Sequence, residues 1–339
     1  MTWLLFLAII GTYSFSCQAC RCDSKVSERT KPSVQAVSTP IKQETGKGLR
    51  VDIKDSVSLY GETLLKRGES AYGTSLFVLS AEVLLLTQTA AIRLINGEPA
   101  KTCALPFGSG PAVVDDSIVY FHEGAVRVVT HEKCESKMYS KLERPPMGFF
   151  ASNESWGWLG RDTAGAFALF TFHGNAVQPL YKTTHAITFT VGWSDSVFFI
   201  EKVAPDIWRI GRVPLVGGTV VFSSTRKSRI PSMLAPTDEG IYIYDGPSRM
   251  VRRLNLDLQH DRVLADRVIC SPLAVSDRVI CAHLGGVYEI PAEGGLPRPI
   301  ATEVEGPITA LAADDRRVVW VVDTAEGQLT VRSRELTPR

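Results

Sequence analysis

The chain has 339 residues, of which 45% are hydrophobic and 22% charged, a balance typical of a soluble protein with a substantial core. Its formal net charge is +1, so it lacks both the broad positive field that favours nucleic-acid binding and an acidic tail. We therefore predict a globular protein that does not bind nucleic acid. The length suffices for one large β domain or for two domains of ordinary size.

The first ten residues, MTWLLFLAII, form an almost wholly apolar run. The run is too short to span a membrane, which takes about 20 such residues. It fits the apolar part of a secretory signal, and Ser14 and Ser16 stand where a signal peptidase reads small residues, although no Lys or Arg precedes the run. We expect residues 1–16 to form a signal peptide; an unprocessed hydrophobic N-terminus is the alternative.

The segment at residues 17–49 is predicted to be a tether. Cys17 resembles the lipid-bearing cysteine of bacterial lipoproteins, although Ser14 occupies a place that is usually aliphatic, and Cys20 is a rival position. Residues 23–49 are rich in Ser, Thr, Lys, Glu and Pro and show no apolar period, a composition that cannot bury a core. We predict a disordered tether over residues 17–49, with a lipid on Cys17 as the one membrane attachment expected.

From residue 50 to the C-terminus the chain repeats one unit. A polar turn, often containing Asp, precedes a strand of aliphatic and aromatic residues, and a further strand, often carrying Arg, follows. Successive units lie 35 to 44 residues apart when they are aligned on the first residues of these aliphatic strands. These anchor residues are Val83, Ile118, Trp156, Val197, Ile241, Val279 and Val318. The unit at Trp156 keeps the spacing but lacks the Asp turn and the Arg.

A period of about 40 residues with several short strands is typical of β-propeller blades. One four-stranded sheet cannot bury both of its faces alone, whereas sheets stacked radially cover each other. No long apolar pattern of period 3.6 runs through residues 51–338, which excludes helical repeats. We predict an all-β, seven-bladed propeller over residues 50–339, with six or eight blades as alternatives if the Trp156 unit is misinterpreted.

The last unit ends soon after its third strand. The segment RVDIKDSVSLY at residues 50–60 has the period of a strand. We predict that it supplies the missing fourth strand and closes the ring, because an open edge would leave a row of backbone groups unpaired.

The Asp turn, the VYF or IYI strand, the V-x-R-V strand and the P-x-x-GG turn together resemble the repeats of exported bacterial propeller proteins of the NHL, YVTN and TolB-like kind. The resemblance covers the chain from about Arg50 onward. It implies a propeller located in the periplasm or on the outer surface. Such propellers include binding scaffolds, lyases and lactonases, so the fold does not specify an activity.

Seven cysteines suggest two disulfides. Cys270 and Cys281 flank SPLAVSDRVI, which reads as strand, turn and strand, so we expect them to pair across this hairpin with an offset of about two residues. Cys103 and Cys134 bracket the second unit and are expected to pair likewise; buried free thiols are the alternative. The CQACRC cluster has metal-like spacing, but no His lies near it, and we predict no metal site.

One set of polar residues recurs at a single repeat position. His122 and His283 each follow their anchor by four residues, and Glu201 and Asp245 hold the same place in their units. If the blades superpose, the four side chains lie on one rim, where the second strand leads to the third. Together they could bind a cation or orient a polar ligand; polar strand ends that merely meet water are the simpler interpretation.

A basic segment, STRKSR, carries Arg226, Lys227 and Arg229 in a predicted loop leading into a blade, where they could contact an anionic partner. A solvated run is the simpler interpretation. The sequence contains no nucleotide, calcium or serine-nucleophile motif, so we predict no cofactor and no catalytic residue. The tryptophans are expected to pack in the core or between blades, with an aromatic sugar-binding platform as the alternative.

Two functions remain open. The favoured hypothesis is a monomeric, non-catalytic envelope propeller that binds an unidentified envelope protein or polar ligand through one rim. The alternative is a hydrolase or lyase with its site at the central channel, formed by His122, Glu201, Asp245 or His283. An enzyme would require several of these groups to converge on a common point.

Overall fold

The chain divides into two units, Met1–Leu49 and Arg50–Arg339. The computed structural model describes residues 75–337 of the second unit except for 14 short gaps. The gaps fall at residues 80–81, 87–89, 96–97, 106–110, 115–116, 131, 153–154, 174–175, 271–272, 276–277, 284, 303, 305 and 324–328. The expected signal peptide, the tether, Cys17 and the strand expected at residues 50–60 lie outside the described residues.

The described chain consists of antiparallel sheets, each built from strands that follow one another in sequence. The first strands are β1 (Ser75–Leu79), β5 (Ala112–Val114), β9 (Gly148–Ala151), β13 (Ala186–Trp193), β18 (Met233–Thr237), β22 (Leu273–Val275) and β26 (Ile308–Ala313). The second strands are β2 (Glu82–Leu86), β6 (Ser117–His122), β10 (Trp156–Arg161), β14 (Ser196–Ala204), β19 (Gly240–Asp245), β23 (Val279–His283) and β27 (Arg317–Asp323).

The third strands are β3 (Ala90–Ile95), β7 (Ala125–Thr130), β11 (Phe167–His173), β15 (Ile207–Pro214), β20 (Met250–Leu254), β24 (Gly286–Ile290) and β28 (Leu329–Glu335). The outermost strands are β4 (Glu98–Ala104), β8 (Ser136–Lys141), β12 (Ala176–Thr183), the pair β16 (Val221–Phe222) and β17 (Arg226–Lys227), β21 (Arg262–Ala265) and β25 (Arg298–Thr302). The last sheet has three described strands, β26, β27 and β28. None of the described residues belongs to a helix long and apolar enough to cross a membrane.

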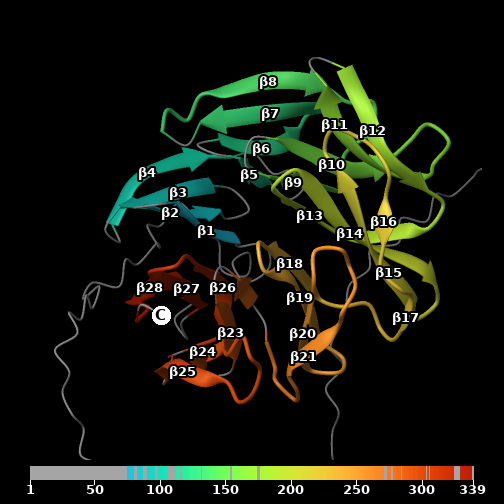
Figure 1. The fold of residues 1–339 in the computed structure, drawn as a ribbon. Helices are drawn as coiled ribbons and strands as arrows, with labels where there is room; N and C mark the ends of the chain where they lie inside the picture. Colours follow the sequence, from blue (N-terminus) through green and yellow to red (C-terminus); the bar gives the residue numbers. More distant parts are fainter. Residues whose placement is uncertain are drawn as a thin grey trace, which may run out of the picture. The chain divides into compact units, whose positions relative to one another are not determined.

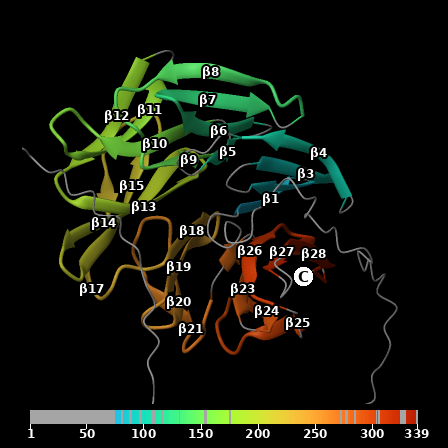
Figure 2. The same cartoon turned by 180° about the vertical axis from the view of Figure 1, so that it is seen from behind.

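The seven sheets are the predicted blades, numbered here 1 to 7 in chain order. Every anchor residue of the repeat lies in a second strand, and the irregular unit at Trp156 forms a complete four-stranded blade, β9 to β12. The prediction of an all-β, seven-bladed propeller is therefore confirmed, and the alternatives of six and eight blades are wrong. Figures 1 and 2 show the blades arranged around a ring, with the first strands nearest its middle.

The hydrophobic core consists of seven clusters, each between two neighbouring blades. Successive side chains of a strand point to opposite faces of its sheet, so one strand serves two clusters. In β2, Val83 and Leu85 pack against blade 7, whereas Leu84 and Leu86 pack against blade 2. The contact of blade 1 with Val319 and its neighbours in blade 7 closes the ring.

Two disulfides reinforce this arrangement, as the sequence predicts. Cys103 in β4 is bonded to Cys134 in the β7–β8 connection, with their Cα atoms 5.2 Å apart, so this bond joins blade 1 to blade 2. Cys281 in β23 is bonded to Cys270, with Cα atoms 5.0 Å apart. Leu273 stands opposite Cys281 in the hairpin, and Cys270 reaches the bond from the chain that precedes β22.

Candidate functional site

The order of strands within a blade defines two rims of the ring. Because neighbouring strands are antiparallel, connections from the second to the third strand lie on one rim, together with the links between blades. We name this rim 1. Connections from the first to the second strand and from the third to the fourth lie on the opposite rim, rim 2.

The four polar residues of the repeat lie in second strands of four different blades. His122, Asp245 and His283 are the last residues of β6, β19 and β23, as expected for rim 1. Glu201 lies three residues before the end of β14, because β14 continues to Ala204. The backbone of His283 pairs with Gly286, and its side chain lies outside the described part of the structure.

Glu201 is fully buried and belongs to a polar cluster between blades 3 and 4. Tyr181 from β12 donates a hydrogen bond of 2.8 Å to Glu201 Oε1, and Arg209 Nε from β15 donates one of 2.6 Å to Oε2. His185 Nδ1 lies 3.5 Å from Oε1. Arg209 also stacks on Phe222, with its guanidinium carbon 3.6 Å from the ring centroid. The cluster thus ties an outermost strand of blade 3 to the middle of blade 4.

The surroundings of Glu201 favour its charged form. Burial alone would raise the pKa of this carboxyl group. Hydrogen bonds from Thr183, Tyr181 and Arg209 lower it by a larger amount, so the pKa lies below its ordinary value. Burial and the hydrogen bond to Glu201 raise the pKa of Tyr181. A carboxylate held in this way is a stable ionised group that accepts several hydrogen bonds.

The other described rim 1 candidates have separate partners. His122 Nε2 lies 3.5 Å from a carboxylate oxygen of its neighbour Glu123. Asp245 is buried and accepts a hydrogen bond of 3.4 Å from the backbone N–H of Ser248. No hydrogen bond or ion pair of the described residues joins His122, Glu201 and Asp245 to one another. Their role in ligand binding stays a prediction.

The basic segment is not a loop that leads into a blade. Arg226 and Lys227 form β17, which pairs with Trp208 and Ile207 of β15, so the outermost strand of blade 4 continues here after a break. The break separates β16 from β17, and both pair with β15. The prediction of an open loop was wrong because backbone pairing with β15 extends this far.

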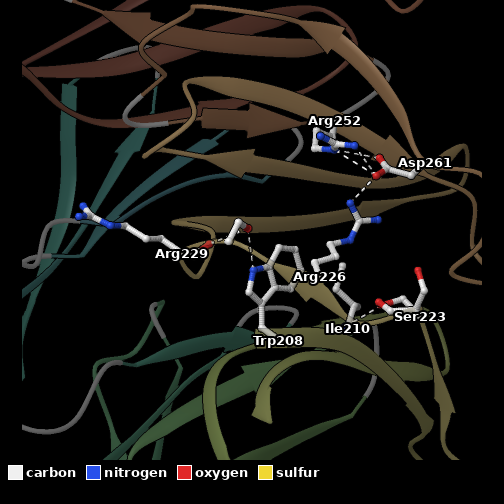
Figure 3. Close-up of polar contacts among 9 residues, drawn as sticks. Trp208, Ile210, Ser223, Arg226, Arg229, Arg252 and Asp261 are labelled. Atoms are coloured by element: carbon white, nitrogen blue, oxygen red, sulfur yellow. Dashed lines mark hydrogen bonds and ion pairs between the residues drawn. The ribbon is translucent and has the colours of Figure 1, made fainter. Parts of the chain in front are cut away.

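Arg226 is engaged by an internal carboxylate, as Figure 3 shows. Its guanidinium pairs with Asp261, which also accepts a hydrogen bond of 3.0 Å from Arg252 Nε. Burial raises the pKa of Asp261, but the hydrogen bonds from Arg252 and Arg226 outweigh it and hold the pKa below its ordinary value. Lys227 and Arg229 are exposed, and Arg229 extends away from this cluster, so these two remain candidates for an anionic partner.

Sequence reasoning missed a groove of about 660 Å³ between blades 2 and 3. The ends of β5 and β7 and the start of β6 line it, which places it on rim 2, opposite the predicted rim residues. Val119 and Val128 of blade 2 form part of its apolar lining, and Trp156 contributes from blade 3. Charged side chains from the β7–β8 connection and β8 also line it: Glu132, Lys133, Glu135 and Lys137.

Aromatic rings form one wall of the groove. Tyr139 packs edge-on against Trp156 and Phe172, with ring centroids 5.2 and 4.9 Å apart. Tyr139 and Met138 from β8 remain 50% and 57% exposed. Tyr139 lies at a β-bulge, because Val126 pairs with Ser140 and Arg127 with Met138, and a bulge re-aims side chains.

One sequence signal points to this groove. The third unit begins its second strand with Trp156, where the other units have Val or Ile. The prediction that tryptophans pack in the core or between blades holds for Trp158, Trp208 and Trp320, which are buried. It also holds for Trp156, which is half-buried, packs against the cluster between blades 2 and 3, and lines the groove as well. Among the residues described, no three His, Cys, Asp or Glu side chains are grouped as metal ligands.

No protein-family model matches the chain, and no curated protein is significantly similar to it in sequence. Solved structures with a similar fold include the β-propeller domain of Cps50 (Swd1) from Myceliophteria thermophila, at 12% identity and a TM-score of 0.56, covering 79% of this chain and 97% of that one. Oligogalacturonate lyase from Vibrio parahaemolyticus is also similar, at 12% identity and a TM-score of 0.56, covering 83% of this chain and 93% of that one.

Hsv2 from Kluyveromyces lactis has 10% identity and a TM-score of 0.53, covering 78% of this chain and 98% of that one. At such identities the likeness shows the fold alone. The chain is a seven-bladed β-propeller. Because these similar structures include both a lyase and proteins not described as enzymes, the propeller fold does not decide between catalysis and binding.

Proposed function

We propose that this propeller is a non-catalytic scaffold that binds a protein partner through rim 2, at the groove between blades 2 and 3. The observation that carries the proposal is the pairing of this groove with the exposed side chains of Met138 and Tyr139. Tyr, Trp and Met are enriched at protein interfaces, where they provide large apolar contact areas. The sequence favoured binding through the rim that carries His122, Glu201 and Asp245, which is rim 1. The proposal keeps the binding function and moves it to rim 2.

Two carboxylates with lowered pKa values, Glu201 and Asp261, lie outside the groove. Glu201 and Asp261 are stabilised by internal arginine partners, as expected for groups that hold the fold together.

We also propose that the protein works in the cell envelope, exported to the periplasm or the outer surface. The two disulfides support this, because disulfides persist in oxidising compartments. Cys17 is the proposed lipid site, and residues 17–49 the proposed tether. Intact-mass measurement of the protein from the membrane fraction tests this part: a mature chain that starts at Cys17 with an added lipid is expected, and one that starts at Met1 contradicts it.

Site-directed photo-crosslinking in intact cells tests the binding function. A photo-reactive residue replaces Met138 beside the groove, and Val216, 86% exposed on the β15–β16 connection of the same rim, serves as the matched control. We expect a discrete crosslinked species from position 138 and none from position 216. If position 138 gives no crosslinked protein while one of the rim 1 positions does, the groove is not the binding site.

A further inference from the structure

The outer edge of each blade exposes unpaired backbone N–H and C=O groups, which are a template for another strand. In most blades a feature of the sequence limits this. Pro99, Pro179 and Pro299 lie in β4, β12 and β25, and proline removes a backbone donor. The outer strand of blade 4 is broken into two strands of two residues each, and β21 has only four residues.

The strand β8 lacks these protections. It has six residues, contains no proline, and is exposed at five of its six positions. It ends the sheet of blade 2, with no described strand beyond it, and Figures 1 and 2 show it on the outside of the ring. The last sheet also ends in an unprotected strand, β28, but there we expect residues 50–60 to pair with it.

The groove lies directly beside β8, because Lys137, Met138 and Tyr139 line it. An open strand edge next to a side-chain pocket provides the two components of recognition by strand addition. Backbone hydrogen bonds supply affinity, and pockets for alternate side chains supply specificity.

Charge on β8 indicates what kind of segment fits. Lys137 and Lys141 are its two charged residues, both are exposed, and neither forms an ion pair with a described carboxylate. Opposite charges on facing strands stabilise a pair, and like charges destabilise it. The bulge at Tyr139 sets Lys137, which pairs with Val128, and Lys141, which pairs with Ala125, on opposite faces of the sheet. A second copy of β8 along this edge would bring two further lysines beside these two, so an acidic segment of another protein is favoured over a second copy.

We propose that β8 is the docking edge for an extended acidic segment of a partner protein. The segment adds as a fifth strand to blade 2 and places an apolar side chain beside Tyr139 and Trp156. It sets one carboxylate beside Lys137 on the groove face of the sheet and another beside Lys141 on the opposite face. This inference rests on the proposed binding function and specifies the chemistry of the partner.

Binding of synthetic peptides to the full chain, measured by calorimetry at low salt, tests the inference. The first probe is a ten-residue peptide of Glu and Val with one central Phe and with Glu on both faces of the extended strand. The second is the same peptide with Lys for Glu, and the third is the acidic peptide N-methylated at every second residue, in either of the two phases. We expect the acidic peptide to bind at least tenfold more tightly than the lysine peptide. One N-methylated phase should lose binding, because it removes the N–H groups that face β8.

Variants of the chain locate the site. K137E combined with K141E should weaken the acidic peptide at least tenfold and favour the lysine peptide, whereas Lys227→Glu, at an exposed lysine of β17, should change neither. Successive backbone N–H groups of a strand point to opposite edges, one towards β7 and the next towards the open edge of β8. Of the two variants Lys137→Pro and Met138→Pro, one therefore removes only an N–H group at the open edge. That variant should keep the wild-type thermal midpoint and lose the peptide.

Three results would overturn the inference. If both N-methylated forms of the peptide still bind, the peptide occupies the groove without adding to β8 as a strand. If the acidic and the lysine peptide bind equally, the partner segment is not acidic. A dimer in sedimentation that Lys137→Glu strengthens would make a second copy the occupant. If position 138 crosslinks a partner whose binding is unchanged in the β8 variants, the inference fails and the proposed function stands; if it crosslinks none, the proposed function itself fails.

Discussion

At the scale of single residues, the ion pairs of this propeller connect parts of the ring that the backbone does not pair. Glu201 accepts hydrogen bonds from Tyr181 of blade 3 and Arg209 of blade 4, so one carboxylate spans the boundary between two sheets. Asp261 similarly joins Arg226 of blade 4 to Arg252 of blade 5. Both carboxyl groups have pKa values below the ordinary range, so their contributions to stability depend on pH.

Replacing Glu201 with Gln should lower the free energy of unfolding by about 1.5–3 kcal/mol at pH 7, because a buried hydrogen-bonded charge is lost. The pKa of Glu201 is lower in the folded than in the unfolded protein. Its ionised form therefore contributes fully to the free energy of unfolding above the unfolded pKa of about 4.3, and this contribution is lost as pH falls through the folded pKa. Urea unfolding at several pH values checks this.

In these measurements the difference between wild type and Glu201→Gln should shrink below about pH 4. A difference that stays constant down to the acid transition would show that the charge of Glu201 contributes nothing. The exposed Glu123→Gln is a suitable control, with a change within about 0.5 kcal/mol expected at every pH.

At the scale of strands, close packing around the middle of the ring requires residues without side chains. Gly192 in β13 lies so close to β9 that an added Cβ would meet the carbonyl oxygen and carbon of Ala151. Those atoms belong to the backbone of an inner strand, which cannot move aside as a flexible side chain would. Blades 3 and 4 therefore approach each other here as closely as two backbones permit.

The variant Gly192→Ala should be destabilised by about 1–3 kcal/mol, the usual cost of overpacking. Gly148→Ala is the matched control, because Gly148 lies in β9 and an added Cβ there meets no atom within 4 Å. We expect the control to unfold at the wild-type midpoint or slightly above it. Chemical denaturation of both variants checks the pair, and equal midpoints would mean that the two blades can separate without cost.

The strands themselves could be predicted from the sequence, because a buried second strand such as IVYFH or IYIYD needs aliphatic and aromatic residues wherever it packs between two blades. The groove could not be predicted. It depends on the bulge at Tyr139 and on the distance between β8 and Trp156, and neither leaves a periodic signal. The partners of Glu201 were missed for a similar reason, since Tyr181 lies outside its repeat unit.

At the scale of the whole molecule, the ring is closed by packing of blade 1 on blade 7. Arg317 of blade 7 also donates a hydrogen bond of 3.2 Å to the carbonyl oxygen of Glu82 in blade 1. The sheet of blade 7 nevertheless ends at its third strand, β28, among the described residues. The fourth strand predicted at residues 50–60 would complete it.

Deletion of residues 50–60 should therefore lower the thermal midpoint of the whole domain, because it leaves β28 as an open edge. Deletion of residues 23–49, the predicted tether, should leave the midpoint unchanged. Differential scanning calorimetry of the two deletions checks this. The same midpoint in both would contradict closure by the N-terminal segment.

The disulfides should contribute unequally. Their cysteines are 31 and 11 residues apart in sequence, so loop closure suggests about 3–4 kcal/mol for Cys103–Cys134 and about 2–3 kcal/mol for Cys270–Cys281. Replacing each pair with Ala and measuring denaturant unfolding checks the order, and both variants should still fold. A larger loss for the Cys270–Cys281 pair would mean that burial of these sulfurs outweighs loop length.

The connectivity of the two disulfides has a consequence for the way the chain matures. Four cysteines can pair in three ways, and here each bonds to the next one along the chain. A chain that is oxidised as it emerges from its N-terminal end presents Cys103 and Cys134 together before Cys270 follows. Among these four thiols, the native bonds are thus the first ones available, so oxidation in chain order favours the native pairing over the other two.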